Sequence, residues 1–66
     1  MNELFNEIKR ERNFSTDTQL AEFFLISKAQ LSKLRAGAKL SAYTLMRLHD
    51  KTGRSVEEIR RYARQR

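Results

Sequence analysis

The chain of 66 residues contains no cysteine, no proline and no tryptophan, and it has only two glycines. The lack of cysteine excludes disulfide bonds, thiolate-bound zinc, iron–sulfur clusters and thiol catalysis. No apolar run approaches the roughly 18 residues of a membrane span, and Glu3 lies where a signal peptide would be basic. We therefore expect a cytoplasmic protein that forms a single domain over residues 1–66 and does not associate with a membrane.

Histidine is also scarce, since His49 is the only one. A zinc site with several imidazoles is excluded, and the neighbours His49 and Asp50 would point about 100° apart on a helix, which is poor geometry for a catalytic relay. We expect His49 at a helix surface or at the edge of the core. Gly37 and Gly53 are isolated and form no phosphate-binding loop. The sequence thus predicts no enzyme activity, no cofactor, no metal and no small-molecule substrate.

Charge is distributed unevenly along the chain, which has 14 Lys and Arg, 8 Asp and Glu, and a net charge of +6. Residues 1–22 have a net charge of −2, residues 23–49 have +5 without a single carboxylate, and residues 50–66 have +3. A middle section without acids attracts phosphate, either of nucleic acid or of an anionic membrane surface. Composition alone does not separate this reading from a basic surface that arose by chance.

Capping residues and helical periodicity divide the chain into five short helices, over about residues 3–12, 17–24, 28–36, 42–52 and from 56 onward. The predicted N-terminal caps are Asn2, Thr16 with Gln19, Ser27 with Gln30, Ser41, and Ser55 with Glu58. The apolar residues at helical spacing are expected to face the core, which in the first, fourth and fifth helices are Leu4, Phe5 and Ile8, Leu45 and Leu48, and Val56, Ile59 and Tyr62. We expect Phe23 at the border of the core. Residues 60–66 are predicted to form a basic C-terminal end that frays.

The segment from Asp17 to Ala36 consists of two predicted helices and a turn of about three residues. Five apolar residues and one small residue of this segment have a characteristic spacing: Leu20, Ala21, Phe24, Ile26, Leu31 and Leu34. The stretch 16–37 follows the pattern Thr-x-x-x-Leu-Ala…Ser-x-x-x-Leu-Ser-x-Leu-x-x-Gly. In this spacing the chain resembles the helix-turn-helix of the lambda-repressor-like family, the Cro and phage-repressor type of DNA-binding regulator. The resemblance extends over residues 3–62.

This resemblance implies an all-α fold of five short helices with the helix-turn-helix at residues 17–36. It also implies a bacterial or phage transcriptional regulator, and we expect a repressor. Members of the family commonly form homodimers that bind two half-sites of double-stranded DNA about one helical turn apart. The helix at residues 28–36 would then lie in the major groove.

Two positions depart from the family pattern. The family usually has glycine in the turn where this chain has Leu25, so either the turn is left-handed, at a cost of about 1 to 2 kcal/mol, or it is remodelled. Many relatives have a glutamate at the position of Arg35, paired with a basic residue at the position of Arg10. Arg35 is therefore either free to contact a phosphate or shares a carboxylate with Arg10.

The predicted solvent face of the helix at residues 28–36 supplies the candidate base contacts: Lys28, Ala29, Ser32 and Lys33. Lysine can donate to guanine, serine can donate or accept, and the alanine methyl can rest against a thymine methyl. The candidate phosphate contacts are Thr16, Arg35, Lys39, Ser41 and Tyr43. We expect Asp17 to pair with Lys28 and not to touch DNA.

A second hypothesis keeps the same scaffold and gives it a different partner. The chain would then be a helical adaptor, similar to an antitoxin, that binds a protein through an apolar or basic face. The dependence of binding on salt separates the two hypotheses, because DNA binding releases counterions from the phosphates.

Overall fold

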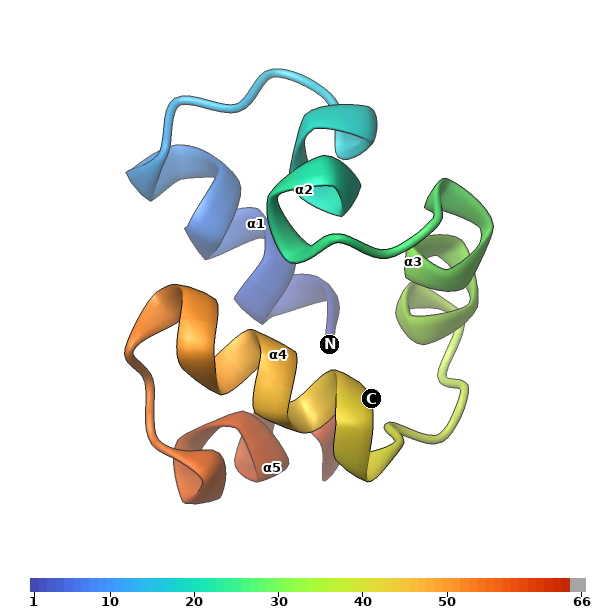
Figure 1. The fold of residues 1–66 in the computed structure, drawn as a ribbon, viewed down its shortest axis with the longest axis vertical. Coiled ribbons are helices and arrows are strands. Elements are labelled where there is room, and N and C mark those ends of the chain that lie inside the picture. The colour runs from blue at the N-terminus through green and yellow to red at the C-terminus, as the bar shows by residue number, and fades with distance from the viewer. Residues whose placement is uncertain (65–66) are drawn as a thin grey trace.

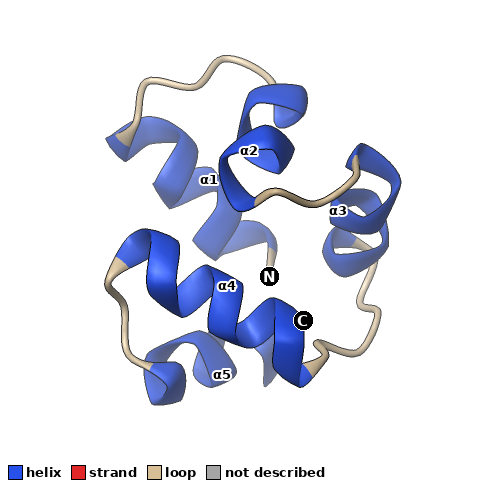
Figure 2. Ribbon diagram, viewed as in Figure 1, coloured by secondary structure: helices blue, strands red, loops and turns tan. Residues whose placement is uncertain are grey.

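Five α-helices follow one another in the computed structural model, which describes residues 1–64 (Figure 1, Figure 2). They are α1 (Asn2–Glu11), α2 (Asp17–Phe24), α3 (Lys28–Arg35), α4 (Ala42–Thr52) and α5 (Val56–Arg64). The described residues contain no strand, so the all-α class and the five helices are confirmed. Residues 60–64 of the expected basic C-terminal end continue α5, and residues 65–66 lie outside the described residues, so its fraying stays a prediction. None of the helices in residues 1–64 combines the length and the apolar character needed to cross a membrane.

Side-chain caps start four of the helices, as the sequence predicts. Thr16 accepts a hydrogen bond from the backbone N–H of Gln19, whose side chain accepts one from the N–H of Thr16, so the capping box of α2 is complete. Ser27, Ser41 and Ser55 each accept from the N–H three residues further on. These bonds satisfy backbone donors that a helix leaves without an internal partner.

Two details of the predicted caps are wrong. Met1 is the N-cap residue of α1, and Asn2 lies inside the helix, where its side chain accepts a hydrogen bond from Arg35. The side chain of Gln30 does not return to the start of α3 but donates to the hydroxyl of Thr44 in α4, at 3.1 Å. Both side chains make contacts between helices, which the local pattern of a cap does not reveal.

The core lies between the five helices and contains at least one apolar side chain from each of them. Phe5 of α1 and Phe24 of α2 are fully buried, with ring centroids 6.1 Å apart. Thr44 is the one buried polar side chain in the described residues, 1% exposed. The other core residues are Leu4, Ile8, Leu20, Ala21, Leu31, Leu34, Leu45, Leu48 and Ile59. The predicted helical periodicity thus identified the inner faces correctly.

The turn between α2 and α3 is left-handed. Leu25 has φ 58° and ψ 39° and is 62% exposed. Its N–H donates to the carbonyl of Glu22, and the N–H of Ile26 donates to the carbonyl of Ala21. These two bonds close the end of α2 in the manner usual for glycine-terminated helices, so of the two alternatives for Leu25 the left-handed turn is the one observed, with a residue for which it is strained.

Arg54, in the loop between α4 and α5, joins three parts of the fold. Its guanidinium lies 2.6 Å from the carboxylate of Glu58 in α5 and 2.8 Å from that of Glu11 in α1, and 3.7 Å from Glu7. The hydrogen bond with Glu58 and the nearby acids raise the pKa of Arg54. Glu7 also accepts a hydrogen bond from the hydroxyl of Tyr62, and this bond raises the pKa of Tyr62. The network attaches α5 to α1.

Two predictions about the edge of the core are confirmed. The Nδ1 atom of His49 lies 2.6 Å from the carbonyl oxygen of Arg54, so this half-buried histidine closes the loop after α4. Phe23 is partly buried and packs edge-on against Phe14, with the guanidinium of Arg12 over its ring at 4.9 Å.

Candidate nucleic-acid interface

The outward face of α3 consists of the four residues predicted to read bases. Leu31 and Leu34 point into the core, and the opposite side of the helix is exposed to solvent. That exposed side presents Lys28, Ala29, Ser32 and Lys33. Within residues 1–64 neither lysine forms an ion pair, so both ammonium groups are available to an external anion. The exposure is confirmed, and base reading by these residues stays a prediction.

The predicted phosphate contacts other than Arg35 are also at the surface, around α3. Thr16 and Ser41 are exposed at the first turns of α2 and α4, and Lys39 is exposed in the loop between α3 and α4. Tyr43 is 65% exposed, but its hydroxyl accepts hydrogen bonds from Arg47, whose guanidinium also lies 4.9 Å from the ring centroid. The hydroxyl of Ser41 also donates to that of Thr44, at 3.0 Å, so Ser41 and Tyr43 are less free than Thr16 and Lys39.

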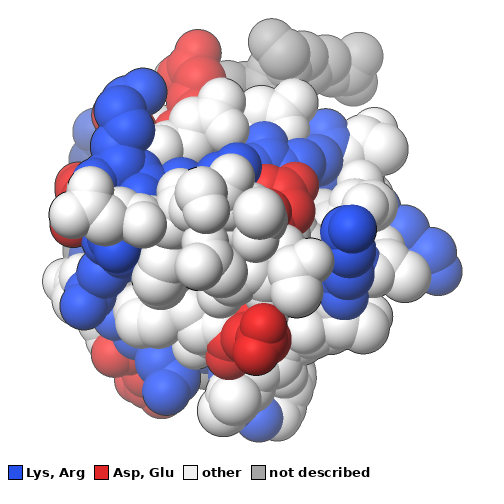
Figure 3. Space-filling model, turned by 90° about the horizontal axis from the view of Figure 1, so that it is seen from above, with Lys and Arg blue, Asp and Glu red and all other residues white. Residues whose placement is uncertain are grey.

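The distribution of charge over the surface is visible from the end of the molecule at which α2 begins (Figure 3). The centre of this face is largely uncharged, and the Lys and Arg side chains lie mostly at its two lateral edges. The right-hand edge, on the side of α3 in Figure 1, shows basic side chains and no acidic one in this view. A positive edge of this kind suits the phosphates that flank a groove.

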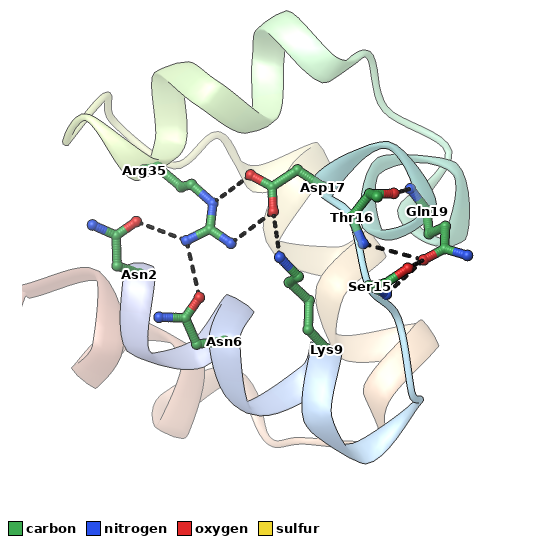
Figure 4. A network of polar contacts seen from close by, with 8 residues as sticks. All are labelled: Asn2, Asn6, Lys9, Ser15, Thr16, Asp17, Gln19 and Arg35. Carbon is green, nitrogen blue, oxygen red and sulfur yellow. Dashed lines mark hydrogen bonds and ion pairs between the residues drawn. The ribbon is translucent and has the colours of Figure 1, made fainter.

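Asp17 does not pair with Lys28, so that prediction is wrong. Its carboxylate accepts two hydrogen bonds from Arg35, at 2.9 and 3.0 Å, and one from Lys9, at 3.1 Å (Figure 4). The short turn folds α3 back along α2, so the end of α3 and not its start approaches the first residue of α2. The hydrogen bonds from Arg35 and from Lys9 hold the pKa of the Asp17 carboxyl below its ordinary value, against the opposing effect of partial burial.

Arg35 is held inside the fold by groups from two other helices. Besides Asp17, it donates to the side-chain oxygens of Asn2 and Asn6 at 3.0 and 3.3 Å, as Figure 4 shows. Its guanidinium also lies 5.4 Å from the ring centroid of Phe5. Of the two sequence alternatives, the structure has Arg35 sharing a carboxylate, but with Lys9 and not with Arg10. We therefore leave Arg35 out of the proposed phosphate contacts.

Both ends of α3 are fixed by contacts that local sequence patterns did not predict. The bond from Gln30 to Thr44 joins its first turn to α4, and Asp17 holds Arg35 at its last residue. No spacing along the chain signals either contact, because the partners lie 14 and 18 residues apart. A helix held at both ends presents its outer side chains in one orientation, which selective binding requires.

No metal site is present among the residues that the structure describes, since no three His, Asp or Glu side chains are placed to share an ion. Comparison with known proteins adds no assignment: no family model matches the chain, and neither the curated proteins nor the solved structures give a match. The likeness to the lambda-repressor-like family thus stays a resemblance in motif spacing. Function has to be argued from the geometry of α2 and α3.

Proposed function

We propose that the chain binds double-stranded DNA in a sequence-specific manner, with α3 in the major groove. The observation that carries this proposal is the outward face of α3. It presents two unpaired lysines beside a methyl group and a hydroxyl, on a helix that α2 and α4 hold in place. The major groove of B-DNA is wide enough to admit an α-helix, and each base pair presents a distinct pattern of donors and acceptors there.

The chemistry of the outward face suits direct readout of bases. Lys28 and Lys33 would donate to the O6 and N7 atoms of guanine, the methyl group of Ala29 would contact thymine, and the hydroxyl of Ser32 would donate or accept. Lys39 and the hydroxyl groups of Thr16 and Ser41 would contact phosphate oxygens on either side of the major groove. Residues 23–49 contain no carboxylate that would repel the DNA backbone.

A regulator of this size is proposed to act as a homodimer on two half-sites. Helix α3 has eight residues, and only its outer side reaches base edges, so one copy specifies few base pairs. Two copies bound about one helical turn apart would double the sequence that is read. Occupation of such a site excludes other proteins from it, which is the simplest mode of repression and the one that we propose.

The proposal is tested by selecting binding sites from random duplexes with the wild-type chain and with two lysine variants. Lys33→Ala should relax the preference at one base pair and cost about 1 to 3 kcal/mol of binding free energy. Lys39→Ala should weaken all sites equally and reduce the slope of log affinity against log salt by about 1. The matched control is Arg60→Ala, an exposed basic residue of α5 outside all of the proposed contacts, which should alter neither quantity.

Two outcomes would contradict the proposal. One is a selection that enriches no sequence. The other is an equal effect of the two lysine variants and the control on sequence preference and on the salt slope. Lys28, Lys33 and Lys39 each bring one positive charge to the DNA, so if each charge displaces one counterion, the expected salt slope is about −3 for each protomer. A slope near zero, together with capture of a protein partner, would favour the helical adaptor.

A further inference from the structure

The outer face of α4 exposes a stripe of side chains to which the proposed function assigns no contact with DNA. The stripe consists of Tyr43, Met46, Arg47 and Asp50, which lie at helical spacing on the side opposite the buried core residues of α4. Tyr43 is 65% exposed and Met46 is 50% exposed. The four residues, with Lys51, line a shallow depression on the surface. Figure 1 shows α4 on the near side of the fold.

The order of the residues in this α4 stripe makes it complementary to itself. The four positions are arranged symmetrically about the midpoint between Met46 and Arg47. When two copies of α4 pack antiparallel about a two-fold axis, Tyr43 of one copy therefore lies opposite Asp50 of the other. Met46 likewise lies opposite Arg47, so the two methionines and the two arginines lie beside the axis, and each Arg47 has to extend along the helix toward Asp50 of the other copy. A two-fold contact of this kind uses the same surface on both copies.

The charges within the stripe also favour a second copy as the occupant. Each chain has a net charge of +6, so two copies repel one another over most of their surfaces, and a contact between them needs a face whose own charges balance. The α4 stripe contains one cation and one anion, and across the two-fold axis Arg47 of each copy can reach Asp50 of the other. Within residues 1–64 Asp50 forms no ion pair. The hydroxyl of Tyr43, which already accepts from Arg47, still has its proton to donate to that carboxylate.

We propose that two copies of the chain associate through the α4 stripe, with their α4 helices antiparallel. The contact does not depend on DNA binding, and it excludes Tyr43 from the phosphate contacts. One stripe is smaller than the roughly 800 Å² that each partner buries in a standard stable interface, so the free dimer is weak. Binding to two adjacent half-sites would raise the effective concentration of one copy around the other.

Sedimentation equilibrium without DNA tests the pairing of charges. The variants are Arg47→Asp, which gives the stripe two acids, and Asp50→Arg, which gives it two bases. Each variant alone should dimerise at least about tenfold more weakly than the wild type, equivalent to about 1.4 kcal/mol, because its two copies repel. An equal mixture of the two variants should form a heterodimer at least as tight as the wild-type dimer, because every pair across the axis is then attractive.

The control for overall charge is Glu57→Arg, at an exposed position in the first turn of α5. This variant changes the net charge as Asp50→Arg does, outside the stripe, and should leave dimerisation within about twofold of the wild type. Circular dichroism establishes that each variant is folded. A wild-type chain that stays monomeric at its solubility limit overturns the proposal, as does a mixture that associates no better than either variant alone. Because DNA is absent, neither result bears on the proposed DNA binding.

Discussion

Replacing Leu25 by glycine should relieve a strain that the α2–α3 turn carries. Leu25 adopts φ 58° and ψ 39°, a left-handed conformation that costs an L-residue about 1 to 2 kcal/mol. Glycine adopts it freely, but its greater freedom in the unfolded chain takes back about 0.4 to 1 kcal/mol. The net gain is about 0.5 to 1 kcal/mol. Because Leu25 is 62% exposed and retains some contact with the protein, the comparison that isolates the backbone is between Leu25→Gly and Leu25→Ala.

Urea denaturation followed by circular dichroism measures this difference. We expect the free energy of unfolding of Leu25→Gly to exceed that of Leu25→Ala by about 0.5 to 1 kcal/mol, a shift of about 4 °C in Tm for a domain of this size. The control is Ala36→Gly at the end of α3, where φ is −80° and glycine should destabilise. Equal stability of the two Leu25 variants would refute the assignment of strain to this turn.

Two further substitutions test the contacts that fix the ends of α3. Asp17→Asn should lower the free energy of unfolding by about 1 kcal/mol at neutral pH, since the charge-assisted hydrogen bonds to Arg35 and Lys9 are weakened. The pKa of Asp17 is lower in the folded chain, so its contribution is present above the unfolded pKa of about 3.9 and is lost as the pH falls through the folded value. Denaturation curves of the two proteins should thus converge below about pH 4, and a constant difference down to pH 2 would argue against the ion pair. Thr44→Val should cost about 1 kcal/mol, because the hydroxyl that accepts from Gln30 is lost, and unchanged stability would show that this bond does not hold α3.

The sequence predicted the helices and the inner face of each of them because these depend on local spacing. Ser27, Ser41 and Thr16 occur directly before apolar periodicity, and each caps the helix that was expected. The exposure of Lys28 and Lys33 follows in the same way from the burial of Leu31 and Leu34 on the other side of the helix. Periodicity reports which side of a helix faces the core, and that was sufficient for the outward face of α3.

The partners of the polar side chains could not be predicted by the same means. The expected pairing of Asp17 with Lys28 rests on the resemblance, in which this position often supports the first residue of the next helix, whereas the packing of α2 and α3 brings Arg35 to Asp17. The true partners come from helices whose mutual orientation no local pattern specifies. For Leu25 one of the two alternatives, the left-handed turn, is the one observed. It could be stated in advance because the left-handed conformation involves the backbone of one residue and not the packing of two helices.

The position of Arg54 has a consequence for tolerance to mutation at the join between the first and last helices. Its guanidinium is shared among three glutamates on two helices, so the loss of Glu11 or Glu58 alone leaves it another acidic partner. The loss of Arg54 leaves three carboxylates near one another with no cation between them, and their mutual repulsion is added to the lost bonds. Redundancy thus protects the acidic members individually, whereas every ion pair of the attachment depends on one basic side chain, and only the hydrogen bond from Tyr62 to Glu7 is independent of it.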